Sequence, residues 1–186
     1  MQDDTLVQIV TDPTPTVEEK FPQSIQTNEM RFNWSRPPTH LFLTRVDGTV
    51  SINSYPAMKT IHTLNAHTSS CMSIAFSPNA RYVAIGASDA LISLWDTTDW
   101  VCQRTVDSSV GMVKSVSFSF DGSFVVGSDD EGTSLEVVHV ESGDSMGKVE
   151  CPQGANVVAW HPSRYWIAWA GEGGGLRIVG AAGGQL

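Results

Sequence analysis

The chain has 186 residues, about the length of one domain, and 41% of them are hydrophobic, which is enough to build a core and excludes a disordered chain. Eleven Lys and Arg stand against 20 Asp and Glu, a net charge of −9 that argues against a stand-alone nucleic-acid binder, because such binding depends on basic side chains. No apolar run approaches the roughly 18 to 20 residues of a membrane-spanning helix, and the acidic start MQDDTLVQIV does not resemble a secretory or mitochondrial leader. We therefore expect a soluble intracellular protein.

An internal repeat sets the expected architecture. Aromatic residues recur at intervals of 42 along the chain, each followed by a turn sequence: Trp34, Phe76, Phe118 and Trp160. A second column of apolar residues keeps the same interval: Leu41, Val83, Val125 and Ile167. A fixed period of about 20 to 50 residues is typical of solenoids and propellers.

The expected elements are all β-strands, because the apolar runs are short, β-branched or aromatic, and bounded by Pro, Gly, Asn and Asp. In chain order they are a leading strand at 6–10 and four units of four strands at about 19–55, 60–96, 101–140 and 145–180. Four antiparallel strands every 40 to 45 residues or so is the period of a β-propeller blade. The sequence thus predicts one all-β domain over residues 1–184, a partial propeller of about four four-stranded blades plus a leftover strand.

One unit carries a family signature. Residues 88–96, SDALISLWD, end in a Trp-Asp pair. Earlier in the same unit, His67 stands just before the strand-forming run that ends at Phe76. The unit therefore resembles a WD repeat. In that family a His, a Ser or Thr, an Asp and a Trp form a hydrogen-bonded brace within the blade. The resemblance implies that His67, Asp89 and Trp95 form this brace. The Ser position falls on Ala87, with Ser88 beside it, which leaves the fourth member open.

A longer resemblance covers roughly residues 5–180. The strings FNWSRPPTHLFLT, SINSYPAMKTIHTLNAH, SDALISLWD and VAWHPSRY are similar to the C-terminal half of the WD-repeat subunits of the THO complex, part of the transcription-export complex. This implies a non-catalytic nuclear scaffold that binds other THO subunits, couples transcription to messenger RNA packaging and export, and meets messenger ribonucleoprotein indirectly. A generic WD-repeat adaptor of a chromatin or ubiquitin-ligase complex is the alternative.

The beginning of the chain departs from that family. Its members are about twice as long and have seven blades, whereas residues 6–10 match the third strand of a blade whose earlier strands are not in the sequence. We therefore expect a fragment or a truncated gene model. Whether the propeller closes stays open at this point.

The sequence offers little reactive chemistry. The five histidines do not share a ligand spacing, no Ser lies in G-x-S-x-G, and we interpret Cys71, Cys102 and Cys151 as small buried hydrophobic residues. The glycine-rich residues 171–184 lack the Lys-Ser/Thr pair of a phosphate loop. We predict no enzyme activity, no cofactor and no metal. A propeller enzyme would need a tight His/Asp/Glu cluster in its channel.

Acidic residues are concentrated in one part of the chain. Residues 121–150 contain one basic and eight acidic residues, a sum of −7. The run Asp129, Asp130 and Glu131 lacks the alternating ligands of a calcium loop. It is our candidate partner-contact face, expected to dock a basic protein segment. The simpler interpretation is a solvated hairpin turn.

Overall fold

The computed structural model describes residues 5–11, 15–107, 109–129, 131–171 and 173–180, with side chains from residue 20 onward. In these segments the chain forms 17 strands in five antiparallel sheets and no helix. The all-β, partial-propeller class predicted from the sequence is confirmed.

The sheets follow one another along the chain. The leading hairpin is β1 (Thr5–Thr11) with β2 (Pro15–Pro22). Blade 1 contains β3 (Thr27–Phe32), β4 (His40–Arg45), β5 (Thr49–Ser54) and β6 (Thr60–Asn65). Blade 2 contains β7 (Cys71–Phe76), β8 (Tyr82–Ala87), β9 (Ile92–Asp96) and β10 (Cys102–Val106). Blade 3 contains β11 (Val113–Phe118), β12 (Phe124–Asp129), β13 (Ser134–His139) and β14 (Ser145–Glu150). Blade 4 has three strands, β15 (Val157–Trp160), β16 (Trp166–Ala170) and β17 (Leu176–Gly180).

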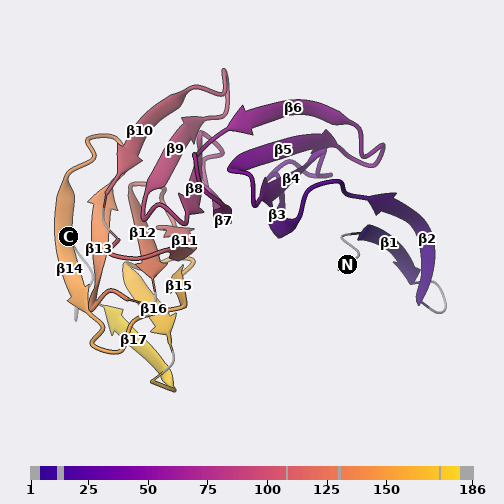
Figure 1. Ribbon diagram of the computed structural model, residues 1–186. Coiled ribbons are helices and arrows are strands. Elements are labelled where there is room, and N and C mark those ends of the chain that lie inside the picture. The colour runs from indigo at the N-terminus through magenta and orange to yellow at the C-terminus, as the bar shows by residue number, and fades with distance from the viewer. Residues whose placement is uncertain (1–4, 12–14, 108, 130, 172, 181–186) are drawn as a thin grey trace.

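The blades are arranged as an open arc (Figure 1). The leading hairpin and blade 4 lie at its two ends, and the first strands of successive blades, β3, β7, β11 and β15, lie beside one another. Each internal blade therefore packs one sheet face against the preceding blade and the other against the following one.

The blades are offset by one strand from the units expected at 19–55, 60–96, 101–140 and 145–180. The first strand of the second predicted unit, β6, pairs with β5 and so completes blade 1. The same offset holds for β10 and β14, which close blades 2 and 3. The physical reason is that the interval of 42 residues determines the period of the repeat but not its phase. The connections before and after β6, residues 55–59 and 66–70, are equally long, so turn length does not determine which neighbour β6 pairs with. The leading strand at 6–10 lies in β1 and pairs with β2.

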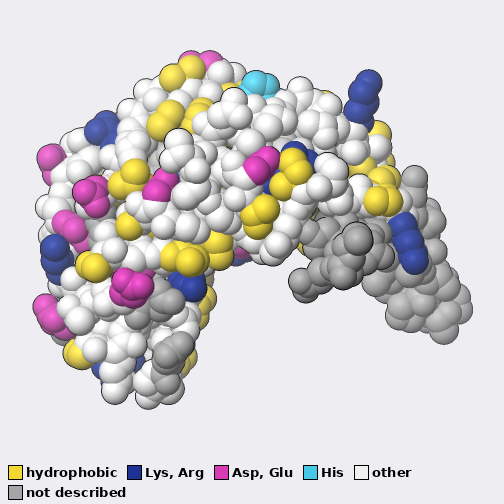
Figure 2. All heavy atoms as spheres, viewed as in Figure 1, with side chains coloured by type: hydrophobic (Ala, Val, Ile, Leu, Met, Phe, Trp, Pro, Cys, Tyr) yellow, Lys and Arg dark blue, Asp and Glu magenta, His cyan; other side chains and the backbone are white. Residues whose placement is uncertain are grey.

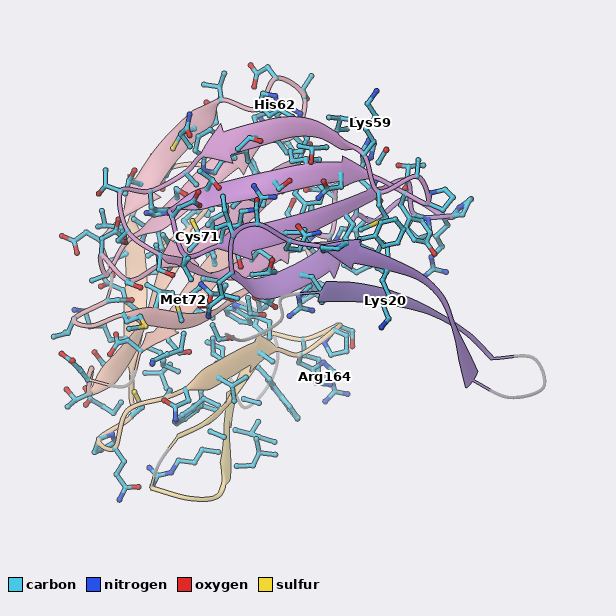
Figure 3. All side chains as sticks on the ribbon, turned by 45° about the vertical axis from the view of Figure 1, so that its right-hand side comes forward. Lys20, Lys59, His62, Cys71, Met72 and Arg164 are labelled. Atoms are coloured by element: carbon cyan, nitrogen blue, oxygen red, sulfur yellow. The ribbon has the colours of Figure 1, made fainter. Side chains whose placement is uncertain are left out.

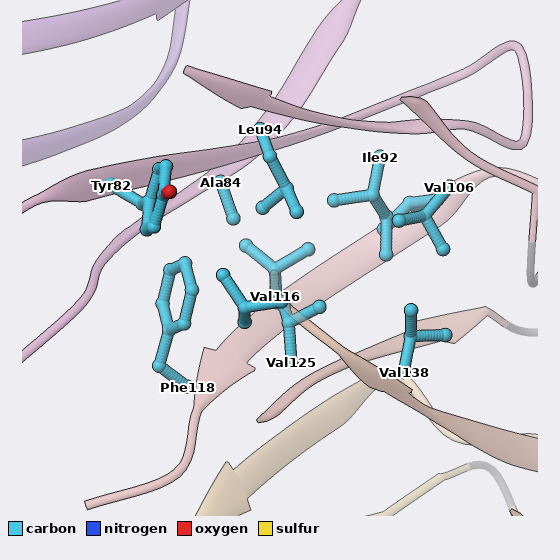
Figure 4. Close-up of a cluster of buried hydrophobic side chains, with 11 residues drawn as sticks. Tyr82, Ala84, Ile92, Leu94, Val106, Val116, Phe118, Val125 and Val138 are labelled. Atoms are coloured by element: carbon cyan, nitrogen blue, oxygen red, sulfur yellow. The ribbon is translucent and has the colours of Figure 1, made fainter. Parts of the chain in front are cut away.

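The hydrophobic core lies between blades rather than within them. At the junction of blades 2 and 3 (Figure 4), five residues of blade 2 pack against blade 3: Tyr82, Ala84, Ile92, Leu94 and Val106. The facing residues of blade 3 include Val116, Phe118, Val125 and Val138. Burying a side chain of this kind contributes about 1.5 to 3 kcal/mol, so the junctions hold the arc together.

Polar contacts repeat at the same junctions. The Ser73 hydroxyl of blade 2 accepts a hydrogen bond from the Val116 N–H of blade 3 at 3.2 Å. The Ser117 hydroxyl of blade 3 likewise accepts from the Trp160 N–H of blade 4 at 3.0 Å. At the first junction, the Glu29 carboxylate accepts from the Ile74 N–H at 2.8 Å. Each blade thus satisfies a backbone donor of the next blade's first strand.

Candidate functional site

The structure brings His67, Asp89 and Trp95 into one buried network. His67 lies between β6 and β7, where its N–H donates to the Gly48 carbonyl at 3.1 Å. Its Nδ1 is 3.0 Å from Asp89 Oδ2, and its Nε2 is 2.9 Å from the Ser93 hydroxyl. The Trp95 indole N–H donates to the same hydroxyl at 2.8 Å. The His67 side chain is only 3% exposed.

Ser93 is therefore the fourth member, and neither Ala87 nor Ser88 takes that place. Ala87 is fully buried, and the Ser88 hydroxyl donates to the Ser70 carbonyl instead. Ser93 and Trp95 are two residues apart in β9, so their side chains share one face of the strand. Looking for a hydroxyl at this spacing from the Trp would have found Ser93 in the sequence.

Both ring nitrogens of His67 have partners in this network. Its Nδ1 faces the Asp89 carboxylate, and its Nε2 lies near the Ser93 hydroxyl and 3.3 Å from the Ile85 carbonyl oxygen. The Ser93 oxygen accepts from the Trp95 indole N–H. Every polar group is paired, and the histidine is sealed from solvent. The network links the loop before β7 to the turn that carries Asp89 and to β9.

Position 48 shows why this loop is so well determined. Gly48 has a φ of +85°, and a Cβ placed there would lie 2.2 Å from the His67 carbonyl oxygen. Only glycine fits both the left-handed backbone and the close approach of the His67 loop. The turn of blade 1 and the brace of blade 2 are in this way one packed unit.

The predicted acidic contact face is not assembled as expected. Asp129 is only 5% exposed. Its carboxylate accepts backbone hydrogen bonds from Val110 at 3.2 Å, from Glu131 at 3.1 Å and from Gly132. Asp129 thus ties the loop after β12 to the loop before β11, and its carboxylate is occupied by these backbone groups. Glu131 is exposed, and Asp130 lies outside the described residues.

On the face shown in Figure 2, the acidic side chains are spread singly among other residues, with basic side chains between them. They do not form one continuous patch in that view. The burial of Asp129 could not be read from the sequence, because it depends on backbone N–H groups that the fold brings within hydrogen-bond distance of its carboxylate.

A second set of contacts links blades 3 and 4 through Asp121. Its carboxylate accepts from the hydroxyls of Ser119 and Ser123 at 2.6 Å and of Tyr165, in blade 4, at 2.8 Å. Burial raises the pKa of Asp121, but these three hydrogen bonds outweigh it and lower the pKa to about 2. The same contact raises the pKa of the Tyr165 phenol.

Blades 2 and 3 are linked in a similar way through Glu141. Its carboxylate accepts from Arg81 at 2.7 Å and from the Tyr82 hydroxyl at 3.2 Å. Arg104 donates to the backbone carbonyl of Ser142 at 2.8 Å and to that of Glu141. Burial and the Glu141 contact raise the pKa of Tyr82. These side chains link neighbouring turns of blades 2 and 3, with the Arg81–Glu141 ion pair largely exposed.

The three cysteines differ in environment. Cys71, near the start of β7 (Figure 3), is buried, and burial raises the pKa of its thiol to about 12. Cys151 is also buried, whereas Cys102 is exposed, contrary to our interpretation of all three as buried. Cys102 lies on β10, the outer strand of blade 2 among the described strands, on which Val106 is buried.

No three His, Cys, Asp or Glu side chains in the described part of the chain come close enough together to hold a metal ion. None of its segments forms a helix with the length and apolarity needed to cross a membrane.

Comparison with known proteins gives the class first. The family model "WD domain, G-beta repeat" matches residues 58–96 and 100–133. The β-propeller domain of Cps50 (Swd1) from Myceliophteria thermophila superimposes with a TM-score of 0.82 at 17% identity, covering 97% of this chain and 64% of that one. The RRP9 WD40 repeats superimpose with a TM-score of 0.76 at 16% identity, over 84% of this chain and 48% of that one. The chain therefore contains WD repeats, and its fold is that of a partial β-propeller.

Within that class, it is similar to THO complex subunit 3 of Arabidopsis thaliana, with 35% identity over 158 residues, which is 85% of this chain and 49% of that protein. The WD repeat-containing protein AAC3 of Dictyostelium discoideum is 39% identical over 115 residues, 62% of this chain and 24% of the relative. The chain thus spans about half the length of the Arabidopsis protein, and the resemblance found in the sequence is confirmed.

Proposed function

We propose that this protein is a non-catalytic scaffold subunit of the THO complex, in which its blades present a rigid surface to other subunits. The observation that carries the proposal is the 35% identity to THO complex subunit 3 over 85% of the chain. Under this proposal the protein acts in the nucleus, where the complex couples transcription to the packaging and export of messenger RNA.

The geometry supports a scaffold in two ways. The junctions between blades combine apolar packing with side-chain ties such as Glu141 to Arg81, so the turns are held in fixed positions. The side chain of His67 is buried and hydrogen-bonded within blade 2, so it is not presented to solvent. Rigid elements that carry exposed turns are the usual framework of a binding surface.

RNA is reached through partners in this proposal. The net charge of −9 opposes binding to a phosphate backbone, because the basic side chains that would displace its counterions are outnumbered. The export function would then belong to the assembly, with this subunit holding its protein components together.

The test is a tagged pull-down from the source cells, with mass spectrometry of the partners and of the intact bait. We expect the other THO subunits to co-purify at physiological salt, and the tag alone to recover none of them. Recovery of a chromatin or ubiquitin-ligase complex without THO subunits would overturn the proposal in favour of a generic WD-repeat adaptor.

A further inference from the structure

Trp34 does not have the place that its spacing predicts. The interval of 42 residues aligns it with Phe76, which packs into the core between blades 1 and 2. In the structure, however, Phe76 pairs with Val83. The matching pair of blade 1 is Phe32 with Leu41. Phe32 therefore occupies the core position of blade 1, and Trp34 lies beyond the end of β3.

The loop that carries Trp34 is fixed by hydrogen bonds. It contains seven residues, 33–39, whereas the corresponding connections of the other blades contain five each, at 77–81, 119–123 and 161–165. Asn33 Oδ1 accepts from the N–H of Thr39 at 3.0 Å and of His40 at 3.2 Å. The Ser35 hydroxyl accepts from the Thr39 N–H at 3.1 Å. Trp34 is 55% exposed on this loop. An ordered loop loses little conformational entropy when it binds a partner.

The turn between β5 and β6 lies beside this loop and adds to the same surface. The Tyr55 N–H donates to the Thr39 carbonyl at 2.8 Å, which joins the turn to the loop. Arg36 of the loop and Lys59 of the turn are both exposed, and Lys59 points away from the sheet (Figure 3). Neither of them forms an ion pair with a described residue. We call residues 33–39 and 55–59 the Trp34 surface.

The Trp34 surface is basic in a chain that is acidic overall. Between Met30 and Ser88 the sequence has one acidic residue, Asp47, and it lies in the turn from β4 to β5 at the opposite end of the blade. The corresponding turns of blade 3, residues 119–123 and 140–144, contain three acidic residues and no basic one. The chain as a whole has a net charge of −9. The two basic side chains therefore complement a negatively charged partner.

The exposure of this end of blade 1 does not depend on the blades beside it. Blade 2 lies between two other blades, and residues 78–81 of its corresponding turn are all exposed. Blades pack against each other through their sheet faces, so this packing leaves the turns at the strand ends in solvent (Figure 1). The Trp34 surface is thus open for a reason that holds in a fully covered blade as well.

We propose that the Trp34 surface binds an acidic segment of a partner protein. The inference rests on the proposed scaffold function and names the chemistry of one of its contacts. An apolar side chain of the segment packs on the Trp34 indole, and flanking carboxylates pair with Arg36 and Lys59. Trp, Tyr and Arg are the residues that most often carry the binding energy of protein interfaces, and Trp34, Tyr55 and Arg36 all belong to this surface.

A protein segment fits this surface better than RNA does. A nucleic acid carries a negative charge at every nucleotide, so its binding depends on many basic side chains along its path. The Trp34 surface has two, and the net charge of −9 repels a long polyanion. A short acidic segment needs only the local charges, because the more distant acids are screened at physiological salt.

The first experiment uses the tagged protein in its THO assembly, with a photo-crosslinking amino acid in place of Trp34. We expect an adduct with another polypeptide, in which the crosslinked segment contains more acidic than basic residues when mass spectrometry identifies it. The control has the same amino acid in place of Val110, which is 75% exposed at the opposite end of blade 3. The control should not give this adduct.

Each other outcome of the crosslinking overturns the inference. An adduct within the same polypeptide would mean that the protein covers this surface itself, and an adduct with RNA would assign the surface to nucleic acid. Co-purification of the other THO subunits with no adduct, or with the same adduct at Val110, also overturns the inference but leaves the scaffold function standing. If no THO subunit co-purifies, the proposed function fails, and this inference fails with it.

The second experiment measures the dissociation constant between the purified full chain and the crosslinked segment, made as a synthetic peptide. Trp34→Ala, Arg36→Glu and Lys59→Glu should each weaken binding by about tenfold. Lys148→Glu is the control, because it makes the same change of charge at a side chain of blade 3 that is 58% exposed. Circular dichroism verifies the fold of all four variants. Unchanged binding by Trp34→Ala or Arg36→Glu, or an equal loss with Lys148→Glu, overturns the proposal.

Discussion

Blades 2 and 4 contain the same repeat but differ in how completely they are covered. In blade 2 every residue of β8 is buried, and the polar groups of its brace are paired. In blade 4 every residue of β17 is exposed. The strand of blade 2 that corresponds to β17 is β9, and its first three residues are buried. Because a repeat gains its stability from its own packing and from contact with its neighbours, we expect blade 2 to be more stable than blade 4.

We expect the largest loss of stability from a substitution in the core of blade 2. Ile85 is fully buried in the core between blades 1 and 2. Ile85→Ala removes that packing and should lower the free energy of unfolding by about 2 to 5 kcal/mol. Urea unfolding followed by tryptophan fluorescence measures the loss. Ile178→Ala, on exposed β17, is the control and should stay within about 0.5 kcal/mol of the original chain.

The brace of blade 2 should come next. Ser93→Ala removes the hydroxyl that contacts both His67 Nε2 and the Trp95 indole N–H, and leaves Nε2 with the Ile85 carbonyl at 3.3 Å. We expect a cost of about 1 to 3 kcal/mol. Ser88→Ala is the matched control, since Ser88 donates only to a carbonyl at 3.3 Å and is partly exposed. Thermal unfolding of both variants compares them. Equal melting temperatures would show that the network adds nothing beyond packing.

Two neighbouring acidic residues, buried Asp129 and exposed Glu131, should differ in their effect on stability. Asp129→Asn weakens hydrogen bonds to the Val110, Glu131 and Gly132 N–H groups and should cost about 1 to 2 kcal/mol. Glu131→Gln changes the charge of an exposed side chain and should cost little. Chemical denaturation gives the two values. A larger loss for Glu131→Gln than for Asp129→Asn would contradict the burial pattern.

The smallest effect concerns acid stability at the junction of blades 3 and 4. The pKa of Asp121 is lowered from 3.8 to about 2 in the folded protein. A lowered pKa stabilises the fold above about pH 3.8, and this stabilisation is lost as the pH falls toward 2. Since the carboxyl is partly solvated, we expect about 1 kcal/mol. Urea unfolding at a series of pH values measures this. Asp121→Asn should abolish the contribution of this carboxyl to the fall of the free energy of unfolding between about pH 3.8 and pH 2. Tyr165→Phe, which removes one of the three hydrogen bonds, should make the same fall less steep.

Much of the architecture was accessible from the sequence because it is written in local patterns. The leading strand expected at 6–10 lies within β1, and the units expected at 60–96 and 101–140 each contain four strands, β6 to β9 and β10 to β13. Short β-branched runs between turn residues favour strands in many contexts. The grouping of strands into blades was not accessible. The end of one unit and the start of the next have the same pattern, so only the observed pairing of β6 with β5 decides between them.

The candidate residues divide along the same line. His67, Asp89 and Trp95 were found through their resemblance to a repeat with fixed spacing, and the structure brings them together. Ser93 was missed because the family pattern points to another strand. The burial of Asp129 was missed because the residues around it, acidic and followed by Gly132, are typical of a solvated turn.

By itself, the sequence determined the period, the all-β class and the resemblance to a THO subunit, because these depend on spacing and residue type along the chain. Only the tertiary structure decided the phase of the blades, the burial of Asp129 and the exposure of Trp34. Each of these depends on which surfaces meet. Burial and hydrogen-bond satisfaction are properties of the assembled sheets, and residues 42 positions apart with similar side chains, such as Val125 and Ile167, acquire different neighbours according to what covers their blade.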